Sequence, residues 1–386
     1  MPSSISSSDP HHNGADHVGA STVGPGLRLT ASDRPGVAQP VPVRDIPIRP
    51  WKRIVLIAAT LFVALLAGWE FYWRAQGAIP GFRNTDSLWS IQRRRIDNDQ
   101  GDATVLVGAS RMLFDLNLPT WERLAGRRPI QLSFEGTSPI AFMENLAADP
   151  NFTGRLLVGV TPDAFFSGFG RHLGALNYYP KESPAQRVGQ WLSTHFVEPY
   201  LAFYDPDFAL VTVLKRQPWP ERSGRAWLTD VRKLSVMAND RDTHLWDKVE
   251  NDADYRSLAQ HVWAERFESP NDPPPAKIQE NAQKQIDRAV AAAHTLRARG
   301  VDVIFVRMPS DGEYLAFENR RFPRAQTWDA LIQRSGARGI HFADYPDLQN
   351  LNLPDWSHLS ESDAVRFTEK LYGIVNDASV PSGIQP

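Results

Sequence analysis

Three residues that lie far apart in the chain have the types and the order that serine-based acyl transfer requires. Ser110 directly follows the apolar segment 104–109, and Asp355 and His358 stand three positions apart within 353–360, LPDWSHLS. In such a site a carboxylate accepts a hydrogen bond from an imidazole and fixes its tautomer, and the other ring nitrogen takes the proton of the serine hydroxyl. We therefore predict that Ser110 is a nucleophile, that His358 is its general base and that Asp355 orients the base.

Each of these residues also has an ordinary structural interpretation. Ser110 would start or cap the helix that follows it, because serine is among the favoured N-cap residues. His358 would be a surface histidine beside a turn aspartate. The combination of a serine at an early strand end with Asp-x-x-His near the C-terminus favours the catalytic interpretation over these two.

An oxyanion hole is predicted from the residues that follow the second apolar run. Gly136 comes shortly after 129–134, PIQLSF. A glycine there lets its N–H face an oxyanion with no Cβ in the way. Together with the N–H of Ser110 it would supply two donors. The other interpretation of Gly136 is a simple turn glycine.

Further residues are candidates for substrate binding. Arg111 follows the nucleophile, and Asp311 lies in RMPSDG at 307–312, where ordinary turn chemistry is the alternative. Five aromatic residues between 170 and 275 could stack on sugar rings or belong to the core: Tyr178, Tyr179, Trp191, Trp219 and Trp227.

The sequence lacks the motifs of the main rival sites. It has no His-Glu-x-x-His, no P-loop and no dinucleotide glycine fingerprint, so we predict no metal and no cofactor. It has no cysteine, which excludes thiolate chemistry and disulfides. The net charge of −2 argues against a nucleic-acid partner, which would require a clustered basic excess.

Alternating apolar runs and helical patterns predict an α/β fold that positions these residues. We expect strands at 104–107, 129–134, 156–160, 301–306 and 339–343. Helices are expected over 278–296 and 360–375, the second with Ser360 as its N-cap. Residues 170–275 interrupt the alternation and predict a helical insertion between the third and fourth strands.

The N-terminal part predicts a membrane anchor. Residues 1–50 are rich in Ser, Gly, Pro and His and are expected to be disordered. Residues 54–73 form an apolar run with one charge, Glu70, which is long enough to span a bilayer as a helix. Trp51 at one edge and Trp69, Tyr72 and Trp73 at the other resemble interfacial aromatic belts. The alternatives are a buried core helix and a signal peptide.

The charges around this run bear on its orientation. Arg44, Arg49, Lys52 and Arg53 precede it, whereas Arg74 and Arg83 follow it closely. Because cytoplasmic flanks carry an excess of Lys and Arg, we expect the N-terminus in the cytoplasm and residues 80–380 outside it.

The ordered motifs resemble the SGNH (GDSL-like) hydrolases. Members of that superfamily carry a Ser after the first strand, a Gly after the second, an Asn after the third and Asp-x-x-His near the C-terminus; Ser110, Gly136, Asp355 and His358 fall in that order. The resemblance implies a flavodoxin-like three-layer sandwich with a central parallel sheet. The sequence departs from the family pattern at two places. The family's Gly-Asp-Ser is Gly-Ala-Ser here. The segment after the third strand, which in the family contains the Asn, reads GVTPD at 159–163, so Thr161 stands where the third oxyanion donor is expected.

With one N-terminal span and a large insertion, the chain looks most like membrane-anchored SGNH-like proteins of bacterial envelope acylation, such as alginate O-acetyltransferases and the D-alanylation protein of teichoic acids. The resemblance implies a periplasmic domain on the inner membrane. That domain would carry a serine acyl-enzyme and transfer or remove acyl groups on cellulose, an alginate-like polymer or a periplasmic glucan. A multi-spanning membrane acyltransferase or a polysaccharide synthase complex would be its partner. The alternatives are a non-catalytic scaffold of a polysaccharide synthesis or secretion complex, and a lipid or thioester hydrolase if the insertion forms an apolar lid.

Overall fold

The computed structural model describes residues 49–215, 233–265, 267 and 272–377, and most of the predicted disordered tail lies outside them. The chain forms two compact units, residues 1–64 and 65–386. Helix α1 (Trp51–Ala75) begins in the first unit and ends in the second. Within the described ranges it is the one helix long and apolar enough to cross a membrane, and it contains the whole predicted span 54–73.

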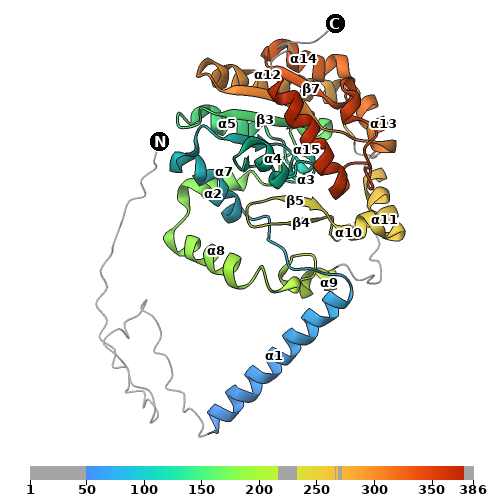
Figure 1. Cartoon of the computed structure of the whole chain (residues 1–386). Helices are drawn as coiled ribbons and strands as arrows, with labels where there is room; N and C mark the ends of the chain where they lie inside the picture. Colours follow the sequence, from blue (N-terminus) through green and yellow to red (C-terminus); the bar gives the residue numbers. More distant parts are fainter. Residues whose placement is uncertain (1–48, 216–232, 266, 268–271, 378–386) are drawn as a thin grey trace, which may run out of the picture. The chain divides into compact units, whose positions relative to one another are not determined.

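The second unit is built on a parallel five-stranded sheet, which confirms the predicted α/β class (Figure 1). Its strands are β1 (Thr104–Val107), β2 (Ile130–Gln131), β3 (Arg155–Val160), β6 (Asp302–Arg307) and β7 (Arg338–His341). Their spatial order is β2-β1-β3-β6-β7. Counted along the chain this is the order 2-1-3-4-5 of doubly wound sheets, in which ligands bind between the first and third strands, where the order reverses.

Two of the expected strands are shorter than predicted. Regular pairing of β2 ends at Gln131, although Leu132 and Phe134 continue beside β1 by donating to the carbonyls of Leu106 and Gly108. The last strand ends at His341, because the chain turns there into a short 3-10 helix, Phe342–Asp344.

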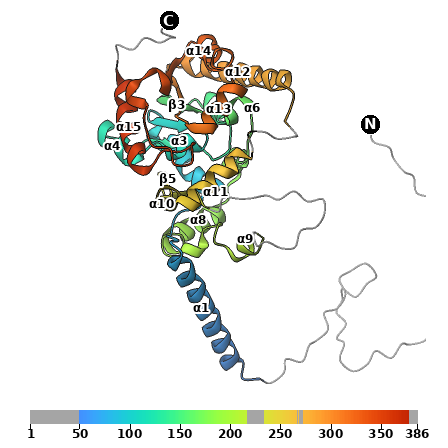
Figure 2. The same cartoon turned by 90° about the vertical axis from the view of Figure 1, so that its right-hand side faces the viewer.

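Helices cover both faces of the sheet, so the second unit has three layers (Figure 2). Alternate strand residues point to opposite faces. Val105, Val107 and Val158 share one buried cluster with helix residues, and Leu106 and Ile304 share the other. The first cluster takes side chains from α2 (Asp86–Arg95), α5 (Ile140–Ala148), α6 (Pro162–Ser167), α12 (Pro275–Ala298) and α14 (Trp328–Ser335). The second takes them from α3 (Ser110–Phe114), α4 (Leu118–Ala125) and α15 (Glu361–Asn376). As predicted, Ser360 caps α15.

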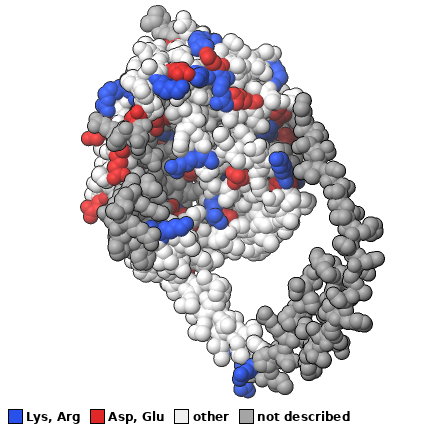
Figure 3. Space-filling view, turned by 180° about the vertical axis from the view of Figure 1, so that it is seen from behind, with Lys and Arg blue, Asp and Glu red and all other residues white. Residues whose placement is uncertain are grey.

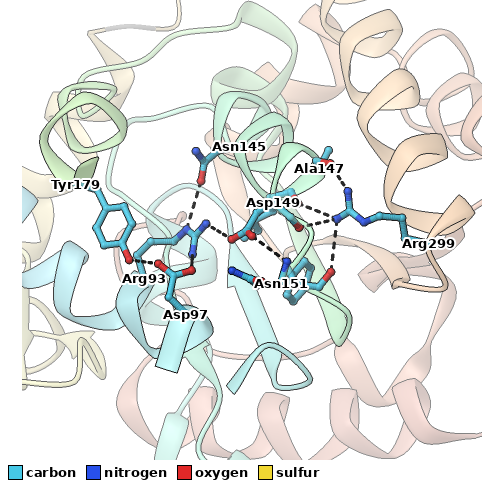
Figure 4. Close-up of polar contacts among 10 residues, drawn as sticks. Arg93, Asp97, Asn145, Ala147, Asp149, Asn151, Tyr179 and Arg299 are labelled. Atoms are coloured by element: carbon cyan, nitrogen blue, oxygen red, sulfur yellow. Dashed lines mark hydrogen bonds and ion pairs between the residues drawn. The ribbon is translucent and has the colours of Figure 1, made fainter. Parts of the chain in front are cut away.

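Two arginines hold the C-terminal end of α5 against its neighbours (Figure 4). Arg299, at the end of α12, donates to the carbonyls of Leu146 and Asp149 at 3.0 Å and also to that of Ala147. Arg93 of α2 forms an ion pair with the Asp149 carboxylate. The last carbonyls of a helix have no partner within the helix, and Arg299 satisfies those of α5. Together with the Arg93–Asp149 ion pair, it joins α2, α5 and α12 on one face of the sheet.

The segment between β3 and β6 is not helical throughout, contrary to the prediction for 170–275. It contains α7 (Gly174–Tyr178), α8 (Pro184–Phe196), α9 (Leu210–Lys215), α10 (Asp247–Asn251) and α11 (Ala253–Ala264). Between α9 and α10 it also forms an antiparallel hairpin of β4 (Ser235–Met237) and β5 (Thr243–Leu245). Turn residue Arg241 is fully buried: its guanidinium donates to the Ser133 carbonyl and lies 4.5 Å from the centre of the Phe134 ring. Long-range contacts of this kind stabilise the hairpin, and they are not visible in a local pattern.

Charges of both signs are interspersed on the face of the molecule that Figure 3 shows. They thin out toward the lower edge of the second unit in that view. The face carries no continuous basic surface, in agreement with the net charge of the sequence.

Candidate active site

Ser110, His358 and Asp355 form one continuous hydrogen-bonded chain. The distance from Ser110 Oγ to His358 Nε2 is 2.8 Å, and the distance from His358 Nδ1 to Asp355 Oδ2 is 2.7 Å. The aspartate and the histidine are fully buried, whereas Ser110 is partly exposed. This geometry allows His358 to take a proton from the serine while Asp355 holds the imidazole in place.

The three-residue spacing of Asp355 and His358 follows from a local turn. Asp355 Oδ1 accepts the backbone N–H groups of Ser357 at 3.0 Å and His358 at 2.8 Å. Its second oxygen, Oδ2, is then left to face the imidazole. One carboxylate therefore both builds the turn and orients the base. Trp356, between them, adopts a left-handed φ of 67°.

The electrostatics of the buried pair favour an ionised aspartate. Burial by itself would raise the pKa of Asp355. The charge of His358, the hydrogen bond from its ring and the backbone donors of His358 and Ser357 outweigh burial and lower that pKa. Asp355 can therefore stabilise an imidazolium when His358 accepts a proton.

Ser110 is the first residue of α3, not its cap. Ala109 occupies the N-cap position and makes no side-chain cap hydrogen bond. The approach of α3 to the sheet depends on two glycines. A Cβ on Gly108 would lie 2.3 Å from Met112 Cβ, and a Cβ on Gly159 of β3 would lie 2.6 Å from the same atom. Glycine is therefore required at position 108 by the close packing of α3 against the sheet.

A cavity of about 410 Å³ opens in front of Ser110. Its lining includes Gly136 and Thr161, the other two residues predicted for an oxyanion hole. Gly136 has a φ of 54°, in the left-handed region that favours glycine. The hydroxyl of Thr161 is buried, and among the described residues it has no hydrogen-bond partner. A buried unpaired hydroxyl next to a nucleophile is available to donate to a bound oxyanion.

Two walls of the cavity differ in chemistry. Phe114 and Trp263 lie beside the base, with ring centres 4.6 Å and 6.1 Å from that of His358. The indole N–H of Trp263 also donates to Asp355 Oδ2 at 3.3 Å. The side near Gly136 carries charged and polar groups. Arg171 lies next to this glycine, since a Cβ built on Gly136 would be 3.7 Å from Arg171 Cδ. Further lining residues are Glu135, Asp163, Ser167, His172, Leu234 and Tyr314.

The predicted substrate-binding roles of Arg111 and Asp311 need correction. Arg111 is fully buried and is paired with Glu318 of α13 (Gly312–Arg321) at 2.9 Å. Its Nε donates to Ser357 at 3.2 Å, so it fastens the Asp355–His358 turn to α3 and α13. The Asp311 side chain caps α13 by accepting the N–H of Gly312. Neither residue lines the cavity.

The aromatic residues proposed for sugar stacking also lie elsewhere. Tyr178 bonds Ser87, Tyr179 bonds Asp97, and Trp191 is exposed on α8. Trp219 and Trp227 lie outside the described residues.

Sequence reasoning missed several residues of the site. Trp263 reaches Asp355 from 92 positions away, and no local pattern marks it. Asp115 lies fully buried one turn after the nucleophile, and its Oδ1 accepts the N–H of Leu359. Burial raises the pKa of Asp115 to about 7, although the charge of His358 opposes this shift. Asp115 follows α3 directly as its C-cap residue, and no local pattern marks it.

A group of possible metal ligands lies away from the cavity lining. Within the described ranges, His244, Asp247 and Glu361 have ligand atoms within 4.8 Å of one another, and both acidic residues are exposed. The proposed acyl chemistry does not involve them.

Comparison with known proteins adds no family assignment. No family model matches the chain, and no curated protein matches it.

Proposed function

We propose that this protein is a serine-dependent acyl-transfer enzyme of the SGNH type, an O-acyltransferase or acyl esterase. The observation that carries the proposal is the hydrogen-bonded chain from Asp355 through His358 to Ser110, which ends in a cavity also lined by Gly136 and Thr161. The position of Ser110 after β1 and of Thr161 after β3 supports it, because this is where the strand order reverses.

The reaction would run in two steps. Ser110 Oγ attacks the carbonyl carbon of an acyl ester or thioester while His358 Nε2 takes its proton. The backbone N–H groups of Ser110 and Gly136 and the hydroxyl of Thr161 would stabilise the tetrahedral oxyanion. Its collapse leaves an acyl group on Ser110, and His358 returns the proton to the departing oxygen or sulfur. A second hydroxyl, from a sugar or from water, then attacks the acyl carbon while His358 takes its proton. Ser110 Oγ departs and receives that proton from His358, which releases the new ester or the free acid and restores the serine.

The acceptor proposed here is a sugar hydroxyl of an envelope polysaccharide. The attacking hydroxyl must come within hydrogen-bond reach of His358 Nε2. The acceptor would therefore lie beside Phe114 and Trp263, and flat aromatic rings suit the apolar faces of sugar rings. Arg171, which lines the cavity near Gly136 together with Phe169, would bind hydroxyl or carboxylate groups.

We further propose that α1 anchors the protein in the bacterial inner membrane, with the N-terminus in the cytoplasm and residues 80–380 in the periplasm. Support comes from the length and composition of α1 and from the basic residues that precede it. An anchored domain of this kind would receive acyl groups from a multi-spanning membrane acyltransferase, or act beside a polysaccharide synthase.

Hydrolysis of p-nitrophenyl acetate by the full chain in detergent tests the proposal. We expect Ser110→Ala to lower the rate by about 1000-fold or more, because loss of one triad member removes nearly all of its contribution. Ser257→Ala, on the exposed face of α11, is the matched control. Mass spectrometry of the unmutated chain should show an acyl adduct on Ser110. Equal rates for the unmutated chain and Ser110→Ala, with no acyl adduct on Ser110, would contradict the proposed enzymatic function. They would favour the alternative that the protein is a non-catalytic scaffold.

A further inference from the structure

Helix α8 carries its apolar side chains on the outside of the second unit. Val188, Trp191, Leu192 and Phe196 recur at helical spacing, and their exposed fractions lie between 46% and 62%. A helix on the surface of a soluble domain buries its apolar stripe and exposes its polar one. In α8 the apolar stripe is exposed instead.

The polar side of α8 faces the protein. Gln190 lies 3.4 Å from the Thr85 hydroxyl. Ser193 donates to Glu198 at 2.6 Å, and this buried carboxylate accepts the backbone N–H of Arg83 at 2.8 Å. These hydrogen bonds fix the rotation of α8, so its apolar face is held outward by specific contacts.

A second apolar face lies on α9. Leu210, Val211 and Leu214 are exposed there, whereas Val213 packs against the neighbouring buried cluster. In addition, Tyr200, between the two helices, is 63% exposed. The two helices together present a surface of Trp, Phe, Tyr, Leu and Val, the composition of segments that lie in a membrane interface.

Residues 65–75 of α1 belong to the second unit, and they contact the segment that joins α8 to α9 (Figures 1 and 2). Arg74 of α1 donates to the Tyr200 carbonyl at 2.8 Å, just after α8. Trp69 donates to the Phe208 carbonyl at 3.2 Å, just before α9. Glu70 accepts the N–H groups of Ala202 and Phe203 at 2.9 Å and 3.0 Å. The last turns of α1 are thus part of the folded unit, and Trp69 and Trp73 pack inside it and do not form the interfacial belt predicted for them.

From this arrangement we infer that the outer faces of α8 and α9 lie in the headgroup region of the bilayer that α1 spans. The inference rests on the proposed anchoring and is independent of the proposed chemistry. The occupant of the surface is lipid, because a helix that spans the bilayer brings the residues around its last turn to the membrane surface. Amphipathic helices bind there with their apolar faces about 5–10 Å below the headgroups. Such contact would restrict the motion of the second unit relative to the membrane, because the unit would then be held by α8 and α9 as well as by α1.

The absence of cysteine from the chain allows a direct test. Single cysteines replace Leu192 on α8 and Leu214 on α9, and each is labelled with an environment-sensitive fluorophore in the full chain. Lys284→Cys, on the exposed side of α12, is the control expected in water, and Leu61→Cys, within the span, is the control expected in lipid. The proteins are placed in nanodiscs of phosphatidylethanolamine and phosphatidylglycerol that carry a quencher on the upper part of the acyl chain.

We expect quenching at positions 192 and 214 to exceed that at 284 by about two-fold or more, since a face in the interface lies within reach of the quencher. A different result would overturn the inference and leave the proposed anchor intact: the label at position 61 is quenched, but the labels at positions 192 and 214 are quenched no more than the label at position 284. No quenching at 61 would overturn the anchoring and the inference with it. If the emission of the label at position 192 shifted to the blue without quenching by the lipid, the label would be in an apolar environment that is not lipid. This result would overturn the inference in favour of a protein partner. The p-nitrophenyl acetate assay reports separately on the chemistry.

Discussion

At the scale of single residues, the candidate site combines the hydrogen-bonded chain Asp355–His358–Ser110 with Thr161, which we propose as the third oxyanion donor. Asp355 builds its own turn and orients His358 with the same carboxylate. The amide donor expected from the resemblance is replaced by the hydroxyl of Thr161, which is buried without a partner among the described residues. A threonine hydroxyl has a shorter reach than an asparagine amide, so this substitution is where the proposed catalysis is weakest.

Thr161→Val should change activity and stability in opposite directions. Removal of one oxyanion donor lowers kcat by about 100-fold. The free energy of unfolding should stay equal or rise, because valine has a similar shape and removes a buried unpaired hydroxyl. Thr161→Ser, which keeps a donor, should retain most of kcat. Steady-state hydrolysis and chemical denaturation of the three proteins provide the measurements, and equal kcat values for Val and Ser would contradict the role of Thr161.

Asp115 should make stability depend on pH. Its folded pKa, about 7, lies above that of an unfolded aspartate, so the folded state binds the proton more tightly. Its contribution is fully present below about pH 4 and is lost as the pH rises through about 7, with a slope of up to about 1.4 kcal/mol per pH unit. Asp115→Asn keeps an acceptor for the N–H of Leu359 and removes the titration. Denaturation at several pH values should show a flatter profile for this variant, and an unchanged slope would argue against an elevated pKa.

At the scale of elements, the approach of α3 to β1 and β3 sets the position of the nucleophile. Gly108 and Gly159, on adjacent strands, leave room for Met112 of α3, and Ser110 begins the same helix. The turn at Arg241 reaches the end of β2, and α11 brings Trp263 to the base. The insertion is therefore part of the site and not a separate module.

Gly159→Ala should displace α3 and weaken the site. The new Cβ would lie 2.6 Å from Met112 Cβ, a contact that the far end of a flexible side chain cannot relieve. Overpacking of this kind costs about 1–3 kcal/mol of unfolding free energy. The rate of p-nitrophenyl acetate hydrolysis should fall as Ser110 moves away from His358.

Gly373→Ala is the matched control for this change. Gly373 lies in α15, and a Cβ there meets no atom within 4 Å. Alanine in a helix is favoured over glycine by about 0.5–1 kcal/mol, so this variant should be slightly more stable and fully active. Thermal unfolding that ranks Gly159→Ala equal to Gly373→Ala would contradict the packing argument.

At the scale of the whole molecule, the chain combines one apolar helix, the proposed anchor, with one three-layer unit, which carries the proposed chemistry. The active-site cavity opens at the carboxyl ends of β1 and β3, and the last turns of α1 are fixed to the insertion by Glu70, Trp69 and Arg74. The insertion thus joins the sheet, which carries the nucleophile, to the helix proposed to hold the protein in the membrane.

The proposed orientation predicts which cysteines can be labelled in intact bacterial spheroplasts that express the full chain. Lys284→Cys should react with a membrane-impermeant maleimide, because residues 80–380 would face the periplasm. Ser21→Cys, in the N-terminal tail, should react after permeabilisation and not before. The cysteine-free chain gives the background. Labelling of position 21 alone in intact spheroplasts would reverse the orientation.

The sequence determined the features that depend on neighbouring residues. Apolar runs of four to six residues marked the strands, and the ends of β1 and β3 placed Ser110 and Thr161 at one edge of a parallel sheet. The spacing of Asp355 and His358 was also readable, because the turn that joins them is closed by Asp355 itself. The resemblance implied a flavodoxin-like central parallel sheet, and the observed strand order β2-β1-β3-β6-β7 agrees with that arrangement.

Only the tertiary structure decided which polar and aromatic side chains meet across long distances in the chain. Arg111 looked like a substrate ligand beside the nucleophile, yet Glu318 and Ser357 hold it in the core. Trp263 had no local mark and reaches Asp355. The apolar residues of α8 share one face of the helix, and hydrogen bonds from its polar side hold that face outward. Periodicity fixes which residues share a face, and the partners of that face come from distant segments that only folding brings together.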